Sequence, residues 1–237
     1  MQSSNYKRIL LKVSGEALAG DKSLGIDKDI LQGVAEQIIS LAKTGIQIGI
    51  VIGGGNIFRG MSVAAKGGDR VTGDHMGMLS TVINALALGD AIRQNGGKSK
   101  VFSSLNMPAV ANIFTQRDAI HALESGYIVL CAGGTGNPFF TTDTAAALKA
   151  VELKCDVLLK GTKVSGVYSD DPMKNPKAEF FKTISYDEVI KRDLRVMDTA
   201  AFALARDNNL PILVYALDVR GGLEAVLNGS AKNTRIG

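Results

Sequence analysis

The sequence is poor in the residues that build disulfide frameworks and metal centres. Its 237 residues include two cysteines and two histidines. So few cysteines cannot form the disulfide framework of a small secreted domain, which favours a reducing compartment. Cys131 lies in an apolar run and Cys155 follows an expected helix, so both are predicted to be core residues. Neither His75 nor His121 has a Cys or His at ligand spacing, which argues against a structural zinc site.

Long hydrophobic runs and clusters of basic residues are also missing. No uncharged stretch without Gly or Pro reaches the roughly 18 residues that a membrane span needs. Ala17-Leu18-Ala19 follows an apolar patch as in a secretory signal, but Lys12 and Glu16 interrupt that patch. The sequence therefore predicts a cytoplasmic protein that does not contact a membrane. Because the net charge is only +4 and basic residues never cluster, no nucleic-acid partner is expected.

The composition is that of an ordinary globular protein. Hydrophobic residues make up 46% and charged residues 21% of the chain. No internal repeat or linker divides it, so we expect one domain over residues 1–237. The order strand, glycine-rich loop, helix recurs along the chain and indicates an α/β fold.

Hydrophobic periodicity and capping residues predict the individual elements. Strands are expected at 8–13, 46–52, 100–102, 128–132, 157–160, 180–184 and 212–217. Helices are expected at 30–44, 109–124, 144–151, 186–192, 199–207 and 221–227, with a further long helix that starts after Asp74 as N-cap and runs to Asp90. The Gly-, Asp-, Lys- and Pro-rich segment 160–176 is expected to be an irregular binding loop.

The stretch 128–151 reads as a buried strand, a turn-rich loop and an Ala-rich helix. Its glycines Gly133, Gly134 and Gly136 allow the backbone to approach a ligand closely. Thr141, Thr142 and Asp143 stand where a helix N-terminus needs caps, and such a terminus attracts phosphate. Taken alone, the stretch would favour a plain capped strand-to-helix turn over a phosphate site.

Two further strands end in possible phosphate-binding turns. Lys12 lies at the end of the first strand, before Ser14-Gly15, and the second strand runs into Gly53-Gly54-Gly55-Asn56 with Arg59 close behind. Consecutive glycines let backbone N–H groups form an anion-binding nest. Since ligands gather at the carboxyl ends of strands in α/β sheets, these turns predict a site for a highly charged phosphate ligand, a nucleotide above all.

Two common nucleotide motifs are excluded. Gly97-Lys98-Ser99 resembles the end of a Walker loop, but Ile92 occupies the position of the leading glycine and the segment follows a helix. The run at Gly53 does not continue as a dinucleotide fingerprint, because Phe58 occupies the position of the last glycine.

Six motifs together resemble the bacterial UMP kinases of the amino-acid kinase family. They are Lys12-Val13-Ser14-Gly15, the GGGNIFR run at 53–59, the DHMGM run at 74–78, the TGNPFFTTD run at 135–143, the loop 162–172 and Val196-Met197-Asp198. The resemblance implies a three-layer αβα sandwich with an open, mostly parallel sheet. It also implies a homohexamer that transfers the ATP γ-phosphoryl group to UMP with Mg²⁺, forming UDP and ADP in pyrimidine nucleotide biosynthesis.

The resemblance also implies which residues form the site, with UMP bound by the N-terminal part and ATP by the part from about residue 155. The implied UMP-binding residues are Gly54, Asp74, Thr135, Gly136, Asn137, Pro138, Phe139, Phe140, Thr141 and Thr142. The implied ATP-binding residues are Lys12, Val13, Ser14, Gly15, Gly55, Arg59, Thr162, Tyr168 and Asp171. The implied catalytic residues are Lys12, Arg59, Asp143 and Asp198, with no dedicated protein site for the metal.

The chemistry of phosphoryl transfer suits these residue types. A phosphate oxygen is already largely ionised at neutral pH, so the reaction needs positioned cations more than a general base. Lys12 and Arg59 would supply the cations, while Asp143 and Asp198 would orient lysines, hold hydrated Mg²⁺ or simply cap helices. Phe139 and Phe140 would wall the uracil or belong to the core.

Other functions stay open at this point. The chain could phosphorylate another small phosphate or a carboxylate, or it could be a regulatory or storage subunit that binds nucleotides without catalysis. Relatives are often activated by GTP and inhibited by UTP, but Gly89 stands where some of them have a basic residue, so the sequence leaves the effector response open.

Overall fold

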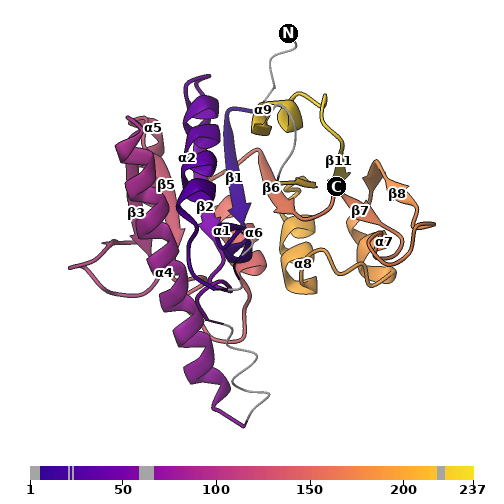
Figure 1. Ribbon diagram of the computed structural model, residues 1–237, viewed down its shortest axis with the longest axis horizontal. Helices are drawn as coiled ribbons and strands as arrows, with labels where there is room; N and C mark the ends of the chain where they lie inside the picture. The colour runs from indigo at the N-terminus through magenta and orange to yellow at the C-terminus, as the bar shows by residue number, and fades with distance from the viewer. Residues whose placement is uncertain (1–5, 21, 23, 59–66, 218–221) are drawn as a thin grey trace.

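The structure, a computed structural model, describes residues 6–20, 22, 24–58, 67–217 and 222–237 (Figure 1). Its centre is a nine-stranded sheet in which all strand pairs are parallel except β10 with β11. In spatial order the strands are β4 (Asn112–Ile113), β3 (Ser99–Ser103), β5 (Ile128–Ala132), β2 (Gln47–Ile52), β1 (Arg8–Val13), β6 (Val157–Thr162), β10 (Ile212–Ala216), β11 (Asn233–Ile236) and β9 (Thr183–Ile184). This confirms the open, mostly parallel sheet.

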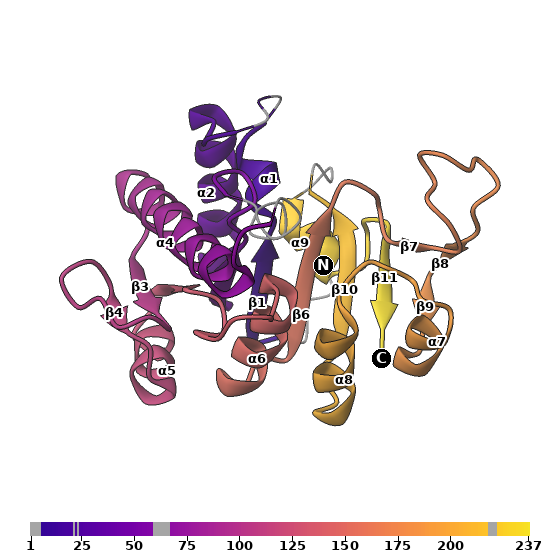
Figure 2. The ribbon, with the colours of Figure 1, turned by 90° about the horizontal axis from the view of Figure 1, so that it is seen from below.

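Helices cover both faces of the sheet, as Figure 2 shows. One face carries α2 (Lys28–Ala42), α4 (Arg70–Gln94) and α9 (Gly222–Leu227), and the short α1 (Gly15–Leu18) follows β1. The other face carries α5 (Gln116–Glu124), α6 (Thr142–Glu152), α7 (Tyr186–Lys191) and α8 (Thr199–Asp207). The three-layer arrangement is therefore confirmed. Within the described chain, no helix combines the length and hydropathy that a membrane span needs.

The central strands read as continuous apolar runs because both of their faces are buried. In β1, Ile9, Leu11 and Val13 belong to the core under α2 and α4, whereas Leu10 belongs to the core under α6. Successive side chains alternate between the faces, so Lys12 lies on the same face as Leu10. The strand thus directs its single internal charge toward α6.

Two predicted helix boundaries are wrong. Residues 109–115 do not form a helix: Asn112–Ile113 pairs with the end of β3, and α5 begins only at Gln116, where the Thr115 hydroxyl accepts the Asp118 N–H at 3.1 Å. Asp74 is not an N-cap, because α4 already begins at Arg70. Its cap is Asp69, whose carboxylate accepts the Thr72 N–H at 2.7 Å.

The segment 160–176 is more regular than predicted. β6 continues to Thr162, and β7 (Val167–Tyr168) pairs antiparallel with β8 (Phe180–Phe181). The last strand, β11, was not predicted at all. Its sequence, Asn-Thr-Arg-Ile, lacks the apolar run of the buried strands, and it is held by pairing with β10 and β9.

Candidate active site

Two lysines lie side by side at the carboxyl ends of neighbouring strands. Lys12 in β1 and Lys160 in β6 are register partners, and both belong to the α6 side of the sheet. The side chains are 9% and 10% exposed, so neither ammonium group is freely solvated. Buried cations of like charge require an anion nearby.

That anion is Asp143 in the first turn of α6. Lys12 Nζ lies 2.8 Å from Asp143 Oδ1, and Lys160 Nζ donates to Asp143 Oδ2. Burial acts to raise the pKa of the Asp143 carboxyl, but the two ammonium groups outweigh it and hold the pKa below its ordinary value. Burial conversely lowers the pKa of Lys160, against the effect of the carboxylate. Asp143 thus orients both lysines, one of the roles expected for it, and Lys160 is a site residue that the sequence reasoning missed.

This ion cluster predicts a pH dependence of stability. The pKa of Asp143 is lower in the folded state than in the unfolded state, where it is about 4. The contribution of Asp143 to the free energy of unfolding is therefore fully present above the unfolded-state pKa and is lost as the pH falls through the lower folded-state pKa. At neutral pH, Asp143→Asn should reduce the free energy of unfolding by about 3 kcal/mol, since it leaves two buried cations unpaired. Urea unfolding should show that the difference in the free energy of unfolding between Asp143→Asn and the wild type is smaller below about pH 4 than at neutral pH. A difference that does not change with pH would contradict the lowered pKa of Asp143.

The glycine turn after β2, residues 53–55, lies directly against the ion cluster's helix. A Cβ on Gly53 would lie 3.5 Å from Thr142 Oγ1 and 3.0 Å from the Gly15 backbone nitrogen. A Cβ on Gly15 would lie 2.5 Å from Gly53 O, so Gly15 has no room for a side chain and Gly53 is tightly packed. The turns after β1, β2 and β5 therefore meet at one place, as the phosphate-site hypothesis required.

A cavity of about 170 Å³ opens beside this junction. It is lined by residues from the turn after β2, from α4 and from the loop before α6: Gly54, Gly55, Phe58, Arg70, Gly73, Asp74, Gly77, Met78, Thr81, Gly134, Thr135, Asn137, Phe140, Thr141 and Thr142. Seven of the ten residues expected to bind UMP are among them. Gly136, Pro138 and Phe139 are not part of the lining.

Asp74 links α4 to the loop that closes this cavity. Arg70 Nε donates to both carboxylate oxygens at 2.9 Å, and the Phe139 N–H donates to Asp74 Oδ2 at 2.7 Å. Burial acts to raise the pKa of Asp74, but the Arg70 and Phe139 donors lower it overall. The Arg70 guanidinium also lies 5.4 Å from the Phe139 ring centre.

The loop itself is held in an unusual conformation. Phe139 has a φ of 72°, which is uncommon for a residue other than glycine, and its N–H bond to Asp74 accompanies that conformation. Phe139 and Phe140 are 65% and 52% exposed. The alternative that they belong to the core is therefore wrong.

The residues expected to bind ATP after β6 lie along the same edge and beyond it. Thr162 ends β6, and its hydroxyl accepts the Val164 N–H at 3.1 Å. Tyr168 and Asp171 line a separate cavity of about 450 Å³. The Tyr168 hydroxyl lies 2.8 Å from Ser165 Oγ and accepts from Lys232 Nζ at 3.2 Å. Arg59 lies outside the described residues.

Asp198 joins α8 to the start of α6. It caps α8 by accepting the Ala201 N–H at 2.7 Å, as expected, and it accepts the Thr144 hydroxyl at 2.7 Å and the Thr141 hydroxyl as well. These contacts fix the first turn of α6, where Asp143 and Thr142 lie. Asp198 can therefore act on the site through the position of that turn.

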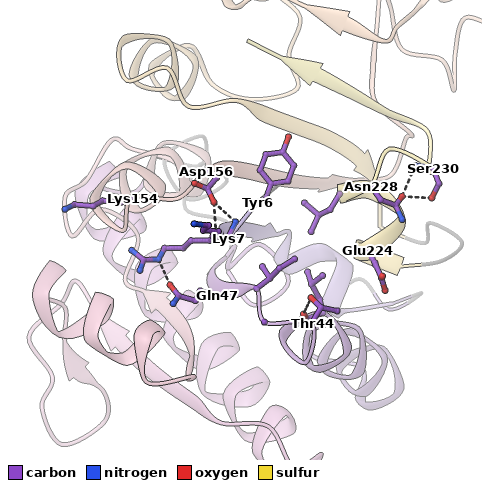
Figure 3. A pocket seen from close by; sticks show the side chains of 14 residues that line it. Tyr6, Lys7, Thr44, Gln47, Lys154, Asp156, Glu224, Asn228 and Ser230 are labelled. Carbon is purple, nitrogen blue, oxygen red and sulfur yellow. Dashed lines mark hydrogen bonds between the residues drawn. The ribbon is translucent and has the colours of Figure 1, made fainter. Parts of the chain in front are cut away.

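A larger cavity, about 990 Å³, lies at the opposite edge of the sheet, where β1, β2 and β6 begin (Figure 3). Its Asp156 carboxylate accepts the backbone N–H groups of Lys7 and Arg8 at 2.7 and 2.8 Å. This cavity contains none of the residues singled out from the sequence. Size alone therefore does not mark the functional site in this chain.

Comparisons with known proteins show which family and which proteins the chain is similar to. The model of the amino acid kinase family matches residues 7–216. Over 229 residues the chain is 54% identical to the uridylate kinase of Brucella anthropi, covering 97% of this chain and 95% of that protein. The crystal structure of UMP kinase from Bacillus anthracis has a TM-score of 0.93 and 38% identity, covering 98% of this chain and 96% of the other. Uridylate kinase from Archaeoglobus fulgidus has a TM-score of 0.73 and 26% identity, covering 97% and 99% of the two chains.

Proposed function

Because this chain belongs to the amino acid kinase family, we propose that it transfers the γ-phosphoryl group of ATP to UMP, forming UDP and ADP. The observation that carries the proposal is the meeting of Lys12, the glycine turn 53–55 and the first turn of α6 beside a cavity lined by most of the expected UMP-binding residues. Such a product belongs to pyrimidine nucleotide biosynthesis, and a cytoplasmic location fits that role.

The reaction brings two polyanions together, so the site must supply positive charge at the point of transfer. The three groups in direct contact carry two positive charges, on Lys12 and Lys160, against the single negative charge of Asp143, so this cluster is net positive, and the Asp198 carboxylate acts on Lys160 from outside it. Backbone N–H groups of the glycine turn and of the α6 N-terminus add further donors. Since the acceptor phosphate is already ionised, no side chain needs to remove a proton.

Mg²⁺ is proposed to enter with ATP and to neutralise charge on its phosphates. Both oxygens of Asp143 face lysines, and both oxygens of Asp198 accept hydrogen bonds. In the described part of the chain, no three His, Cys, Asp or Glu side chains gather as a metal-binding group. The donor set therefore fits an ion held mainly by phosphate oxygens and water, with at most one or two carboxylates.

An ADP-release assay tests the proposed activity. The chain should turn over ATP with UMP, and more slowly or not at all with CMP, TMP, dUMP or small carboxylates. Turnover with a carboxylate and none with UMP would show that the chain is a kinase for carboxylates instead. Nucleotide binding without turnover of any acceptor would leave only a noncatalytic binding protein.

Replacing Asp74 with asparagine should weaken the binding of UMP and leave the binding of ATP nearly unchanged. The carboxylate joins Arg70 to the Phe139 N–H at the wall of the cavity, and of the described residues assigned to ATP only Gly55 lines that cavity. We expect the KM for UMP to rise about tenfold, the order of a lost charge-assisted hydrogen bond, with the KM for ATP nearly unchanged. Asp69→Asn is the matched control, because Asp69 caps the same helix outside the cavity lining. Equal effects on both substrates would place the acceptor pocket elsewhere.

We also propose that the protein is a homohexamer in which α4 contacts another copy. Met76, Leu79 and Ile83 are 42%, 47% and 50% exposed and recur at helical spacing along this helix. A continuous apolar stripe on a long helix is typical of an interface. Light scattering of the wild type should give the mass of six chains. The Leu79→Glu variant should give a smaller mass, because the charge would disrupt the contact between copies.

A further inference from the structure

The buried face of α4 carries polar side chains directly beneath the turns that form the site. Thr81 and Asn84 are 3% and 0% exposed, and they lie three positions apart, so they occupy one face of the helix. The proposed mechanism gives neither of them a role. Because buried polar groups cost free energy unless they are hydrogen-bonded, their partners show what they hold in place.

Asn84 holds the glycine turn after β2. Its side-chain Nδ2 donates to Gly53 O at 2.7 Å and to Asn56 Oδ1 at 2.7 Å. Asn56 Nδ2 donates in return to Asn84 Oδ1 at 3.1 Å and to Gly25 O at 2.8 Å. The two amides form a reciprocal buried pair. Asn84 thereby fixes the position of Gly53 relative to α4.

Thr81 holds the loop after β5. The Gly133 N–H donates to Thr81 Oγ1 at 2.8 Å, and the hydroxyl itself donates to Met78 O at 2.7 Å. Gly133 is the first residue of that loop and has a φ of 77°, so this hydrogen bond is made where the chain turns away from the strand. One turn of α4 therefore contacts both corners of the site.

The glycine turn also packs closely on the same helix. A Cβ on Gly54 would lie 2.8 Å from Gly77 O and 2.8 Å from Ser80 Cβ. Backbone therefore lies directly on backbone at this point, and a shift of the helix would shift the turn. Figure 2 shows α4 on the same side of the sheet as α2, and the hydrogen bond from the Phe139 N–H to Asp74 places the loop between β5 and α6 beside the amino-terminal half of α4.

We infer that Thr81 and Asn84 are positioning residues, which together set the separation between the turn 53–55 and the loop that starts at Gly133. This inference rests on the proposed phosphoryl transfer, in which the turn 53–55 contacts both nucleotides and the loop that starts at Gly133 contacts UMP. Displacement of reacting groups by about 1 Å can cost about a hundredfold in rate, so a small change in this separation affects kcat more than binding. Asn84 does not line the cavity proposed for UMP, whereas Thr81 does, and in this role both side chains act through the backbone groups that they hold.

The test compares Thr81→Val with Thr81→Ser. Valine keeps the shape and removes the acceptor of the Gly133 N–H, whereas serine keeps the hydroxyl and removes a methyl group. We expect Thr81→Val to lower kcat about tenfold with both KM values within about threefold of the wild type, and Thr81→Ser to stay within about twofold. If Thr81 only filled space, serine would be the impaired variant and valine would be normal. That reversal, or equal kinetics in the two variants, would overturn the inference.

Two further measurements separate positioning from folding and from the function itself. Asn84→Asp, which loses the donor to Gly53 O, should lower kcat in the same way, and Ile92→Val serves as a control for a buried change on the same helix that leaves kcat unchanged. All variants are assayed well below their melting temperatures, so a fold defect appears in the melting curve. If the wild type does not phosphorylate UMP, the proposed function fails. If it does and Thr81→Val has normal kcat, only the positioning inference fails.

Discussion

Replacing Lys12 with alanine is expected to lower kcat by about a thousandfold, whereas the KM for UMP changes by less than about threefold. Lys12 is a buried cation at the carboxyl end of β1, held by Asp143 at 2.8 Å and lying next to the turn 53–55. A cation placed there meets the charge that develops on the transferred group. Its loss should therefore destabilise the transition state more than the bound substrates.

Steady-state kinetics at saturating ATP measures this effect directly. The matched control is Lys7→Ala, because Lys7 belongs to the cavity at the other edge of the sheet, and it is the Lys7 backbone rather than its side chain that bonds Asp156. This control should leave kcat unchanged. If Lys12→Ala also leaves kcat unchanged, Lys12 has no part in the transfer step.

Much of the fold can be predicted because its informative signals are local. The strands at 8–13 and 128–132 are largely apolar runs, with Lys12 as the internal charge of the first, that end in glycine-bearing turns, and the structure places them where the sequence indicated. The caps Thr141 and Asp198 were also predicted, since a cap acts within one turn of its own helix. Parallel strands bring their carboxyl ends to one edge, which is why the three turns could be expected to meet.

Other features depend on partners far away in the chain. β4 and β11 are short strands whose own residues carry little β signal, and they exist because β3 and β10 offer an edge to pair with. The true start of α4 was missed because Asp69 and Asp74 are both acceptable caps, and only the fold shows that Asp74 contacts the Phe139 N–H instead.

The positioning residues were equally invisible in the sequence. Thr81 and Asn84 lie in a long helix in which apolar side chains occur on both the buried and the exposed faces. A periodic pattern then identifies no unique inner face. Their partners, Gly133 and Gly53, lie 52 and 31 positions away along the chain.

Replacing Lys160 with methionine is expected to lower kcat by about a hundredfold, although the sequence placed this lysine only at the start of the expected binding loop and not among the site residues. Lys160 lies beside Lys12 in the sheet and shares Asp143 with it. With both lysines present the cluster is net positive. Methionine keeps the apolar stem but leaves Lys12 and Asp143 as a neutral pair, so the attraction for the transferred phosphoryl group falls.

A charge-balanced double variant separates this argument from simple packing. Lys160→Met with Asp143→Asn restores the net positive charge through Lys12 alone, so it should recover about tenfold of the rate lost in Lys160→Met. Both proteins keep side chains of similar size at the two positions, and the kcat values are compared at neutral pH. If the double variant is no faster than Lys160→Met, the net charge of the cluster does not govern the reaction, and the orientation of Lys12 by Asp143 matters more than that charge.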